Sequence, residues 1–189
     1  MADRLNVICG TTRPGRAGIA VARWAADQAR THGGFDVEFV DLDDFDLPLL
    51  DEPNHPRLRR YQHDHTQRWS ASVDAADAYL FVTPEYDYFP SAALINAVQC
   101  LSAEWAYKAA AVVSYGGISG GLRAAQEFRQ LLGNVNVMAI VQTVPIAFFS
   151  KFIDDGGVFQ PDKPIADGLA LALSELAKWT NALKPLRTP

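Results

Sequence analysis

The sequence predicts a doubly wound α/β fold, in which five parallel strands form one sheet and helices cover both of its faces. Two observations lead to this fold class. Five short apolar runs have the length and composition of strands that are buried on both faces. The segments between these runs repeat apolar residues with the period of an α-helix. Strands that alternate with helices form right-handed βαβ units, and five such strands suit the sheet order 2-1-3-4-5.

The apolar runs give the expected strands in chain order. They are Leu5–Cys9, Val37–Leu42, Ala78–Thr83, Ala109–Ser114 and Val137–Val141. With 189 residues the chain is long enough for a substantial core, so we expect a single domain over residues 1–189.

Helical stripes fill the gaps between the strands. Four helices are expected from apolar residues that fall on one helical face; these sets are Ile19, Ala22, Ala26 and Ala29; Leu94, Ala97, Leu101 and Trp105; Leu122, Ala125, Phe128 and Leu132; and Leu169, Leu173, Leu176 and Leu183. A fifth helix is predicted over residues 66–75. Residues 144–163 lack this period and contain four phenylalanines. We predict a long loop there that covers the site or contacts a second subunit.

Composition narrows the class of protein. Hydrophobic residues make up 49% of the chain and charged residues 21%, which is typical of a globular protein. A net charge of −5 disfavours general nucleic-acid binding, and no apolar run is long enough to span a bilayer. The first residues do not have the layout of a signal peptide, and Cys9 and Cys100 both lie in apolar segments. We therefore expect a cytoplasmic location with two buried, unpaired thiols.

We assign no metal site. His63 and His65 form the only H-x-H pair, and neither a cysteine nor a third histidine lies near them in the sequence.

The sheet order predicts where a ligand binds. In the order 2-1-3-4-5 the winding direction changes between strands 1 and 3, and ligands bind at the carboxyl ends of the strands at that point. The loops at this edge are residues 10–18 (the first loop), residues 84–90 (the second loop) and residues 115–121 (the third loop).

The first loop has the composition of a phosphate site. It contains Gly, Thr and Arg residues between a buried strand and a helix, and a helix N-terminus attracts anions through its free N–H groups and its dipole. A nucleoside triphosphatase loop is excluded, because Arg16 and Ala17 stand where that motif needs Lys and Ser or Thr. The dinucleotide fingerprint G-x-G-x-x-G is also missing. The prediction that remains is a monophosphate site; the alternative is an ordinary turn with surface arginines.

The other two loops suit a flat ligand. The second loop holds three aromatic residues between Pro84 and Pro90, and a flat, partly apolar ligand would lie against them. Alternatively, these aromatics pack against a neighbouring element or another subunit. The third loop has four glycines, which allow the backbone to approach a ligand closely.

With the three loops placed, the chain resembles the NADPH-dependent FMN reductase family of flavodoxin-like flavoproteins, which includes azo-dye and quinone reductases. That family's first loop reads G-S/T-x-R, and Gly10-Thr11-Thr12-Arg13 matches it. Its second loop reads P-E-Y-N and is followed by L-K-N; Pro84-Glu85-Tyr86 matches, and Leu94-Ile95-Asn96 matches in part. Its glycine pair after the fourth strand corresponds to Gly116-Gly117. The resemblance covers nearly the whole chain.

The resemblance implies a flavodoxin-like fold and a non-covalent FMN that is reduced by NADPH or NADH. It implies phosphate contacts from Thr11, Arg13, Arg16 and the amides of Gly18 and Ile19. It implies that the flavin ring lies along Pro84, Glu85, Tyr86, Asp87 and Tyr88, with its edge near Ser114, Gly116 and Gly117.

The implied reaction is ping-pong. A hydride passes from NAD(P)H to the flavin, the nicotinamide leaves, and a small-molecule acceptor such as a quinone, an azo compound or a free flavin takes its place. The cofactor carries the chemistry, so no catalytic acid or base is assigned. Members of the family are homodimers or dimers of dimers, with each flavin near the subunit interface.

The second loop departs from the family pattern. Asp87 replaces an Asn, and an ionised Asp offers only acceptors where Asn also offers a donor. Phe89, Pro90, Ser91 and Ile95 differ as well. Two alternatives to the reductase therefore stand: a flavin-binding electron carrier or redox sensor, and a flavodoxin-like interaction module that has lost its cofactor.

Overall fold

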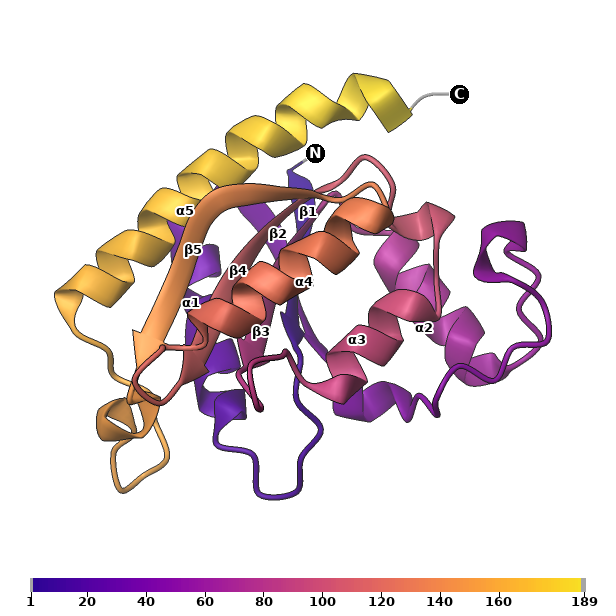
Figure 1. The fold of residues 1–189 in the computed structure, drawn as a ribbon. Coiled ribbons are helices and arrows are strands. Elements are labelled where there is room, and N and C mark those ends of the chain that lie inside the picture. The colour runs from indigo at the N-terminus through magenta and orange to yellow at the C-terminus, as the bar shows by residue number, and fades with distance from the viewer. Residues whose placement is uncertain (1, 188–189) are drawn as a thin grey trace.

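A computed structural model describes residues 2–187 and contains one five-stranded sheet in the order β2-β1-β3-β4-β5 (Figure 1). All of its neighbouring strands run parallel, so the predicted sheet order is confirmed. The strands are β1 (Asp3–Cys9), β2 (Phe35–Asp41), β3 (Ala78–Pro84), β4 (Ala109–Gly116) and β5 (Met138–Ala147). The helices are α1 (Gly18–His32), α2 (Asp64–Asp74), α3 (Ala92–Gln99), α4 (Leu122–Asn134) and α5 (Lys163–Leu183).

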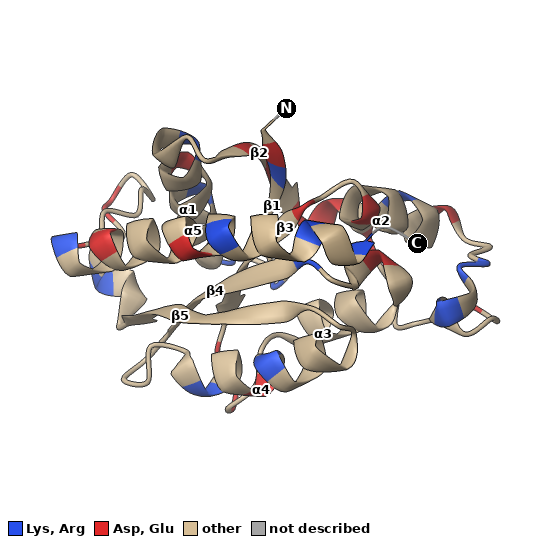
Figure 2. Cartoon of the chain, turned by 90° about the horizontal axis from the view of Figure 1, so that it is seen from above, with Lys and Arg blue, Asp and Glu red and all other residues tan. Residues whose placement is uncertain are grey.

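The sheet is covered on both faces, as its apolar strands require. Helices α1 and α5 pack on one face, and α2, α3 and α4 pack on the other (Figure 1). The strands β3, β4 and β5 carry no charged side chain, and the charged residues lie mainly on the helices and loops around them (Figure 2). Alternate residues of each strand therefore contribute to two separate apolar clusters, one under each helical layer.

The third predicted helix is shorter than the sequence indicates. The stripe from Leu94 to Trp105 predicted one helix, but α3 ends at Gln99. Trp105 lies in a following 3₁₀ turn and is fully buried; its indole N–H donates to the carbonyl of Val98 at 3.1 Å. Its ring packs edge-on against that of Trp69, with 5.8 Å between the ring centres. The four residues of this stripe are therefore buried in the core, although the helix ends before the last two of them.

The fifth strand is longer than predicted. It continues to Ala147 because its backbone pairs with β4 as far as Gly116. The first residues of the loop predicted over 144–163 therefore belong to the sheet. Within residues 2–187, every helix is too short or too polar to cross a lipid bilayer.

Candidate functional site

The first loop leaves β1 and enters α1 at the point where the sheet changes its winding direction. The amide of Gly10 donates to the carbonyl of Val82 at 2.8 Å, which ties the loop to β3. A Cβ atom at Gly10 would lie 2.9 Å from that carbonyl oxygen, so the close approach requires glycine. Helix α1 begins after Ala17 with no side-chain cap. The first N–H groups of α1 are thus left for a ligand.

Arg16 is held by a carboxylate that the sequence analysis did not connect with it. Its guanidinium makes two hydrogen bonds to Asp41 at the end of β2, at 2.5 and 2.7 Å, and one to the carbonyl of Thr11 at 2.6 Å. The hydrogen bond from Arg16 to Asp41 raises the pKa of Arg16 far above its ordinary value, so this side chain stays charged. Arg16 therefore fixes the first loop to β2, whereas the side chain of Arg13 is exposed and makes no ion pair within residues 2–187. The available signal was an acidic residue at the carboxyl end of the neighbouring strand.

A cavity of about 300 Å³ lies where the first, second and third loops meet. It is lined by Arg13, Gly15, Arg16, Ala17, Gly18, Pro84, Glu85, Tyr86, Tyr115, Gly116 and Phe149. The tertiary structure thus brings together residues of all three predicted loops. Phe149, from the predicted aromatic loop, also lines this cavity.

Tyr115 belongs to the cavity but was not among the predicted site residues. It lies near the end of β4 and is only 4% exposed, and its ring packs at an angle of 56° against that of Phe149, with 4.8 Å between the ring centres. Its hydroxyl lies so close to Gly18 that a Cβ atom there would be 1.8 Å away. Position 18 therefore has to be a glycine, because any side chain there would clash with Tyr115.

The second loop forms a tight turn with a strained backbone. Tyr86 and Phe89 exchange two backbone hydrogen bonds of 2.9 and 3.0 Å. The central residues Asp87 and Tyr88 have φ angles of 48° and 85°, as a type I′ turn requires. The amides of these two residues take no part in the hydrogen bonds of the turn. The hydroxyl of Tyr86 lies 3.3 Å from that of Thr11 and so links the second loop to the first.

Glu85 supports the turn from below. Its carboxylate is almost fully buried and accepts hydrogen bonds from Arg123 Nε at 2.7 Å and from the amide of Ala124 at 3.4 Å. Burial alone raises the pKa of Glu85, but hydrogen bonds from Arg123, Ser119 and Ala124 outweigh it and lower that pKa. The guanidinium of Arg123 also stacks over the ring of Tyr88, 4.7 Å from its centre. The carboxylate of Glu85 therefore faces the start of α4.

The third loop owes its shape to a different glycine pair from the one predicted to meet the ligand. Gly120 and Gly121 have φ angles of 61° and 79°, and a Cβ atom on Gly121 would lie 2.7 Å from the amide nitrogen of Tyr115. Gly116 lines the cavity, whereas a Cβ atom on Gly117 would meet nothing within 4 Å. Ser114 is fully buried and its hydroxyl donates to the carbonyl of Gly120 at 3.0 Å. Ser114 was predicted to approach a ligand, but it does not line the cavity, and the proton of its hydroxyl is used within the third loop.

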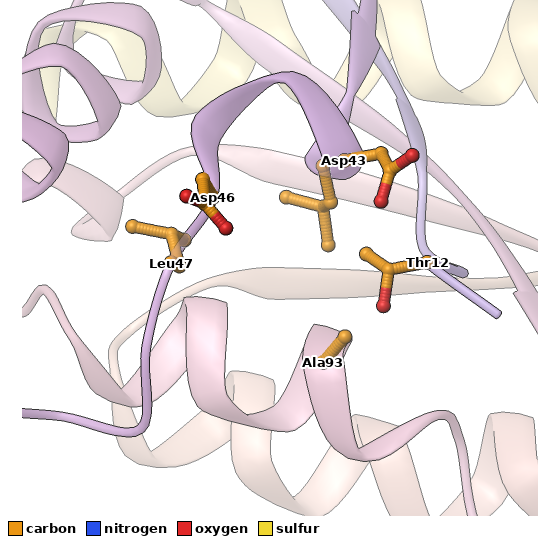
Figure 3. Close-up of a pocket in the computed structure, with 6 residues that line it drawn as sticks. Thr12, Asp43, Asp46, Leu47 and Ala93 are labelled. Carbon is orange, nitrogen blue, oxygen red and sulfur yellow. The ribbon is translucent and has the colours of Figure 1, made fainter. Parts of the chain in front are cut away.

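A second, smaller cavity of about 160 Å³ lies on the other side of the first loop. Figure 3 shows Asp43 and Asp46 around it, with Thr12 and Ala93. Two carboxylates repel an anion, whereas the larger cavity offers Arg13 and the positive end of α1. The electrostatics therefore direct a phosphate group to the larger cavity.

Large apolar side chains surround the second and third loops. Five of them are between 42% and 83% exposed: Tyr88, Phe89, Ile118, Leu122 and Phe148. Leu122 was predicted to lie on the buried stripe of α4, but it is exposed because the helix begins there at the edge of the sheet. We call these five residues the apolar rim.

The larger cavity suits a ligand with an anionic end and a flat end. Arg13, Gly18 at the uncapped start of α1 and Tyr115 line one part of it, and Pro84, Glu85 and Tyr86, which lead into the turn at Asp87 and Tyr88, line another. No histidine or cysteine lines it among the described residues. The arrangement can bind and orient a phosphate-bearing ring.

Comparison with known proteins shows which family and which solved structures this chain resembles. The profile of the family "NADPH-dependent FMN reductase" matches residues 4–151. An NAD(P)H-dependent FMN reductase of Schizosaccharomyces pombe is 35% identical over 144 residues, covering 75% of this chain and 71% of that protein. A probable NADPH:quinone oxidoreductase of Oryza sativa is 33% identical over 175 residues, covering 84% of this chain and 80% of that protein. The structure of FerB, a flavoenzyme NAD(P)H:(acceptor) oxidoreductase from Paracoccus denitrificans, aligns with a TM-score of 0.75 over 96% of this chain and 99% of that chain, at 20% identity. The flavodoxin-like fold class is thereby confirmed.

Proposed function

The chain belongs to the NADPH-dependent FMN reductase family and is an enzyme that uses FMN as cofactor and NAD(P)H as electron donor, and we propose that it reduces a quinone or a similar small acceptor by a ping-pong mechanism. The observation that carries this proposal is the cavity between the three loops, which has a cationic end and a flat, aromatic end. The nicotinamide leaves this cavity before the acceptor enters it.

The end of the cavity next to α1, which we call the phosphate end, would hold the phosphate of FMN. The contacts proposed there are the hydroxyl of Thr11, the guanidinium of Arg13 and the amides of Gly18 and Ile19. Arg16 contributes by ordering the first loop, since its donors are directed to Asp41 and Thr11.

The opposite end of the cavity, which we call the ring end, would hold the flavin ring. The residues that would hold it are the segment from Pro84 to Tyr88 and the backbone of Ser114, Gly116 and Gly117. The amides of Asp87 and Tyr88 are free to donate hydrogen bonds to the ring edge, because the turn does not use them. Such fixed donors stabilise charge that develops during electron transfer.

No side chain at the ring end is proposed as an acid or base. Glu85 is the only buried carboxylate there, and its lowered pKa together with its bonds to Arg123 keeps it ionised and turned toward α4. The bound FMN supplies the hydride chemistry, and the chain orients it and limits access to it.

We also propose a cytoplasmic homodimer or dimer of dimers. The apolar rim lies beside the ring end, and a second copy of the chain would bury it. The two buried, unpaired thiols suit a reducing compartment.

The absorbance spectrum of freshly purified protein, repeated anaerobically after addition of NADPH and then of NADH, tests the function. We expect a flavin spectrum that bleaches, and parallel initial-rate lines when NAD(P)H is varied at several quinone concentrations. A flavin spectrum that neither nucleotide bleaches would favour an electron carrier. A colourless protein that also fails to take up added FMN would favour the interaction module.

A further inference from the structure

Tyr115 is a buried tyrosine whose hydroxyl is aimed at the start of α1. The residue is 4% exposed, and its ring is held by Phe149 on one side and by the close approach to Gly18 on the other. This position fixes the hydroxyl beside the uncapped N-terminus of α1, within the cavity. The sequence accommodates this position of the hydroxyl, because only a glycine at position 18 leaves room for it.

Within residues 2–187, the hydroxyl of Tyr115 has one potential partner, the hydroxyl of Thr11, which also lies 3.3 Å from the hydroxyl of Tyr86. A phenol hydroxyl both donates and accepts, so contact with Thr11 leaves Tyr115 the capacity for a further hydrogen bond, and its place in the lining of the cavity makes that capacity available to a ligand.

The surroundings favour an acceptor that is an anion. The N-terminus of α1 attracts negative charge, and Arg13 lines the same cavity. Burial raises the pKa of Tyr115 well above its ordinary value, and Cys9 and Tyr86 add to this effect. The phenol therefore stays protonated and acts as a donor.

We propose that the hydroxyl of Tyr115 donates a hydrogen bond to the phosphate of bound FMN, and that this bond makes the site select phosphorylated flavin over riboflavin. The inference rests on the proposed function and adds to it a residue from β4 whose hydroxyl lies against Gly18 at the start of α1. Tyr115 is then a specificity-determining residue, and its effect depends on the phosphate being present.

The test compares two ligands and two variants of the full-length protein. Apo wild type, Tyr115→Phe and the control Tyr79→Phe are titrated with FMN and with riboflavin, and binding is followed by flavin fluorescence. Tyr79 is also a fully buried tyrosine, but its hydroxyl bonds to the carbonyl of Val73 in the other core cluster. Tyr115→Phe removes one oxygen atom and keeps the ring, so it preserves the packing against Phe149.

We expect Tyr115→Phe to weaken FMN binding by about 10- to 100-fold, the range for a hydrogen bond to a charged group, and to change riboflavin binding less than about twofold. Tyr79→Phe should alter both affinities equally, if at all. Equal losses for FMN and riboflavin in Tyr115→Phe, or no loss for FMN, would overturn the inference while leaving the proposed function intact.

Inorganic phosphate, added as a competitor, should weaken FMN binding to wild type and leave riboflavin binding unchanged. If it does not compete with FMN, a phosphate subsite at Tyr115 is also refuted. A wild type that binds neither flavin would instead refute the proposed function.

Discussion

At the phosphate end of the cavity the first loop is held by buried groups, whereas at the ring end the second loop lies in solvent. Arg16 and Asp41 form an ion pair in which both side chains are less than a fifth exposed. Tyr88 is half exposed, has a φ angle of 85°, and rests against Arg123, whose side chain is 47% exposed. One end is fixed by close packing, and the other is a strained turn under a half-exposed side chain.

This difference matches what the proposed function requires of each end. The phosphate would be the same in every turnover, so a rigid, preorganised site lowers the cost of binding it. In the proposed ping-pong reaction the ring end admits a nicotinamide and then an acceptor of another shape, which a solvent-exposed turn can accommodate. Substitutions at the phosphate end should therefore cost more than equivalent ones at the ring end.

The largest effect is expected from Asp41→Asn. It leaves the guanidinium of Arg16 without its main counter-charge in a largely buried position, and this should lower the free energy of unfolding by about 3 kcal/mol. Asp43→Asn is the matched control, because Asp43 contacts the same guanidinium at 3.3 Å but is 54% exposed. Its cost should stay below about 1 kcal/mol. Urea unfolding measures both; equal costs would show that the phosphate end is not held by this pair.

Gly18→Ala should cost about 2 kcal/mol and weaken FMN binding, because the new Cβ atom would clash with the ring of Tyr115. Gly117→Ala at the ring end is the comparison, since a Cβ atom there meets nothing within 4 Å. We expect Gly117→Ala to change the free energy of unfolding little. If thermal unfolding gives the same loss for both variants, the two ends do not differ in packing.

Glu85→Gln tests the support beneath the turn and should cost about 1 kcal/mol at neutral pH, as the loss of a charged helix cap does. The pKa of Glu85 is lowered in the folded state, so its carboxylate contributes stability that is present above its ordinary pKa of 4.5 and is lost as the pH falls through the folded value. The difference in melting temperature between wild type and variant should be constant from pH 7 to 5 and shrink below pH 4.5. A constant difference down to pH 3 would contradict this assignment.

The smallest effect is expected from Asp87→Asn. Asn tolerates the left-handed conformation of the turn and removes a negative charge near the flavin ring, so the flavin reduction potential should rise. Because Asp87 is exposed, solvent screening limits the rise to about 20 mV. A spectroscopic redox titration measures it, with Asp46→Asn as the control because Asp46 has a similar φ angle away from the ring. An unchanged potential would exclude a direct electrostatic role for Asp87.

Much of the fold could be predicted from the sequence because its signals are local. The periods of the apolar residues located all five strands and all five helices, and the sheet order then identified the three loops that meet at one edge. The errors fell where local signals end. The stripe through Trp105 continues the helical period, but the chain turns back after Gln99 to bury the indole in the core.

The site was predicted less completely. The sequence by itself determined the sheet, the loops and the residue types that suit an anion and a flat ring, because these depend on neighbours along the chain. Only the tertiary structure showed that the guanidinium of Arg16 bonds to Asp41 and that the carboxylate of Glu85 bonds to Arg123. It also showed that the hydroxyl of Tyr115 packs against Gly18. These pairs join residues that are far apart in the sequence, and such a contact depends on distances that no local pattern encodes.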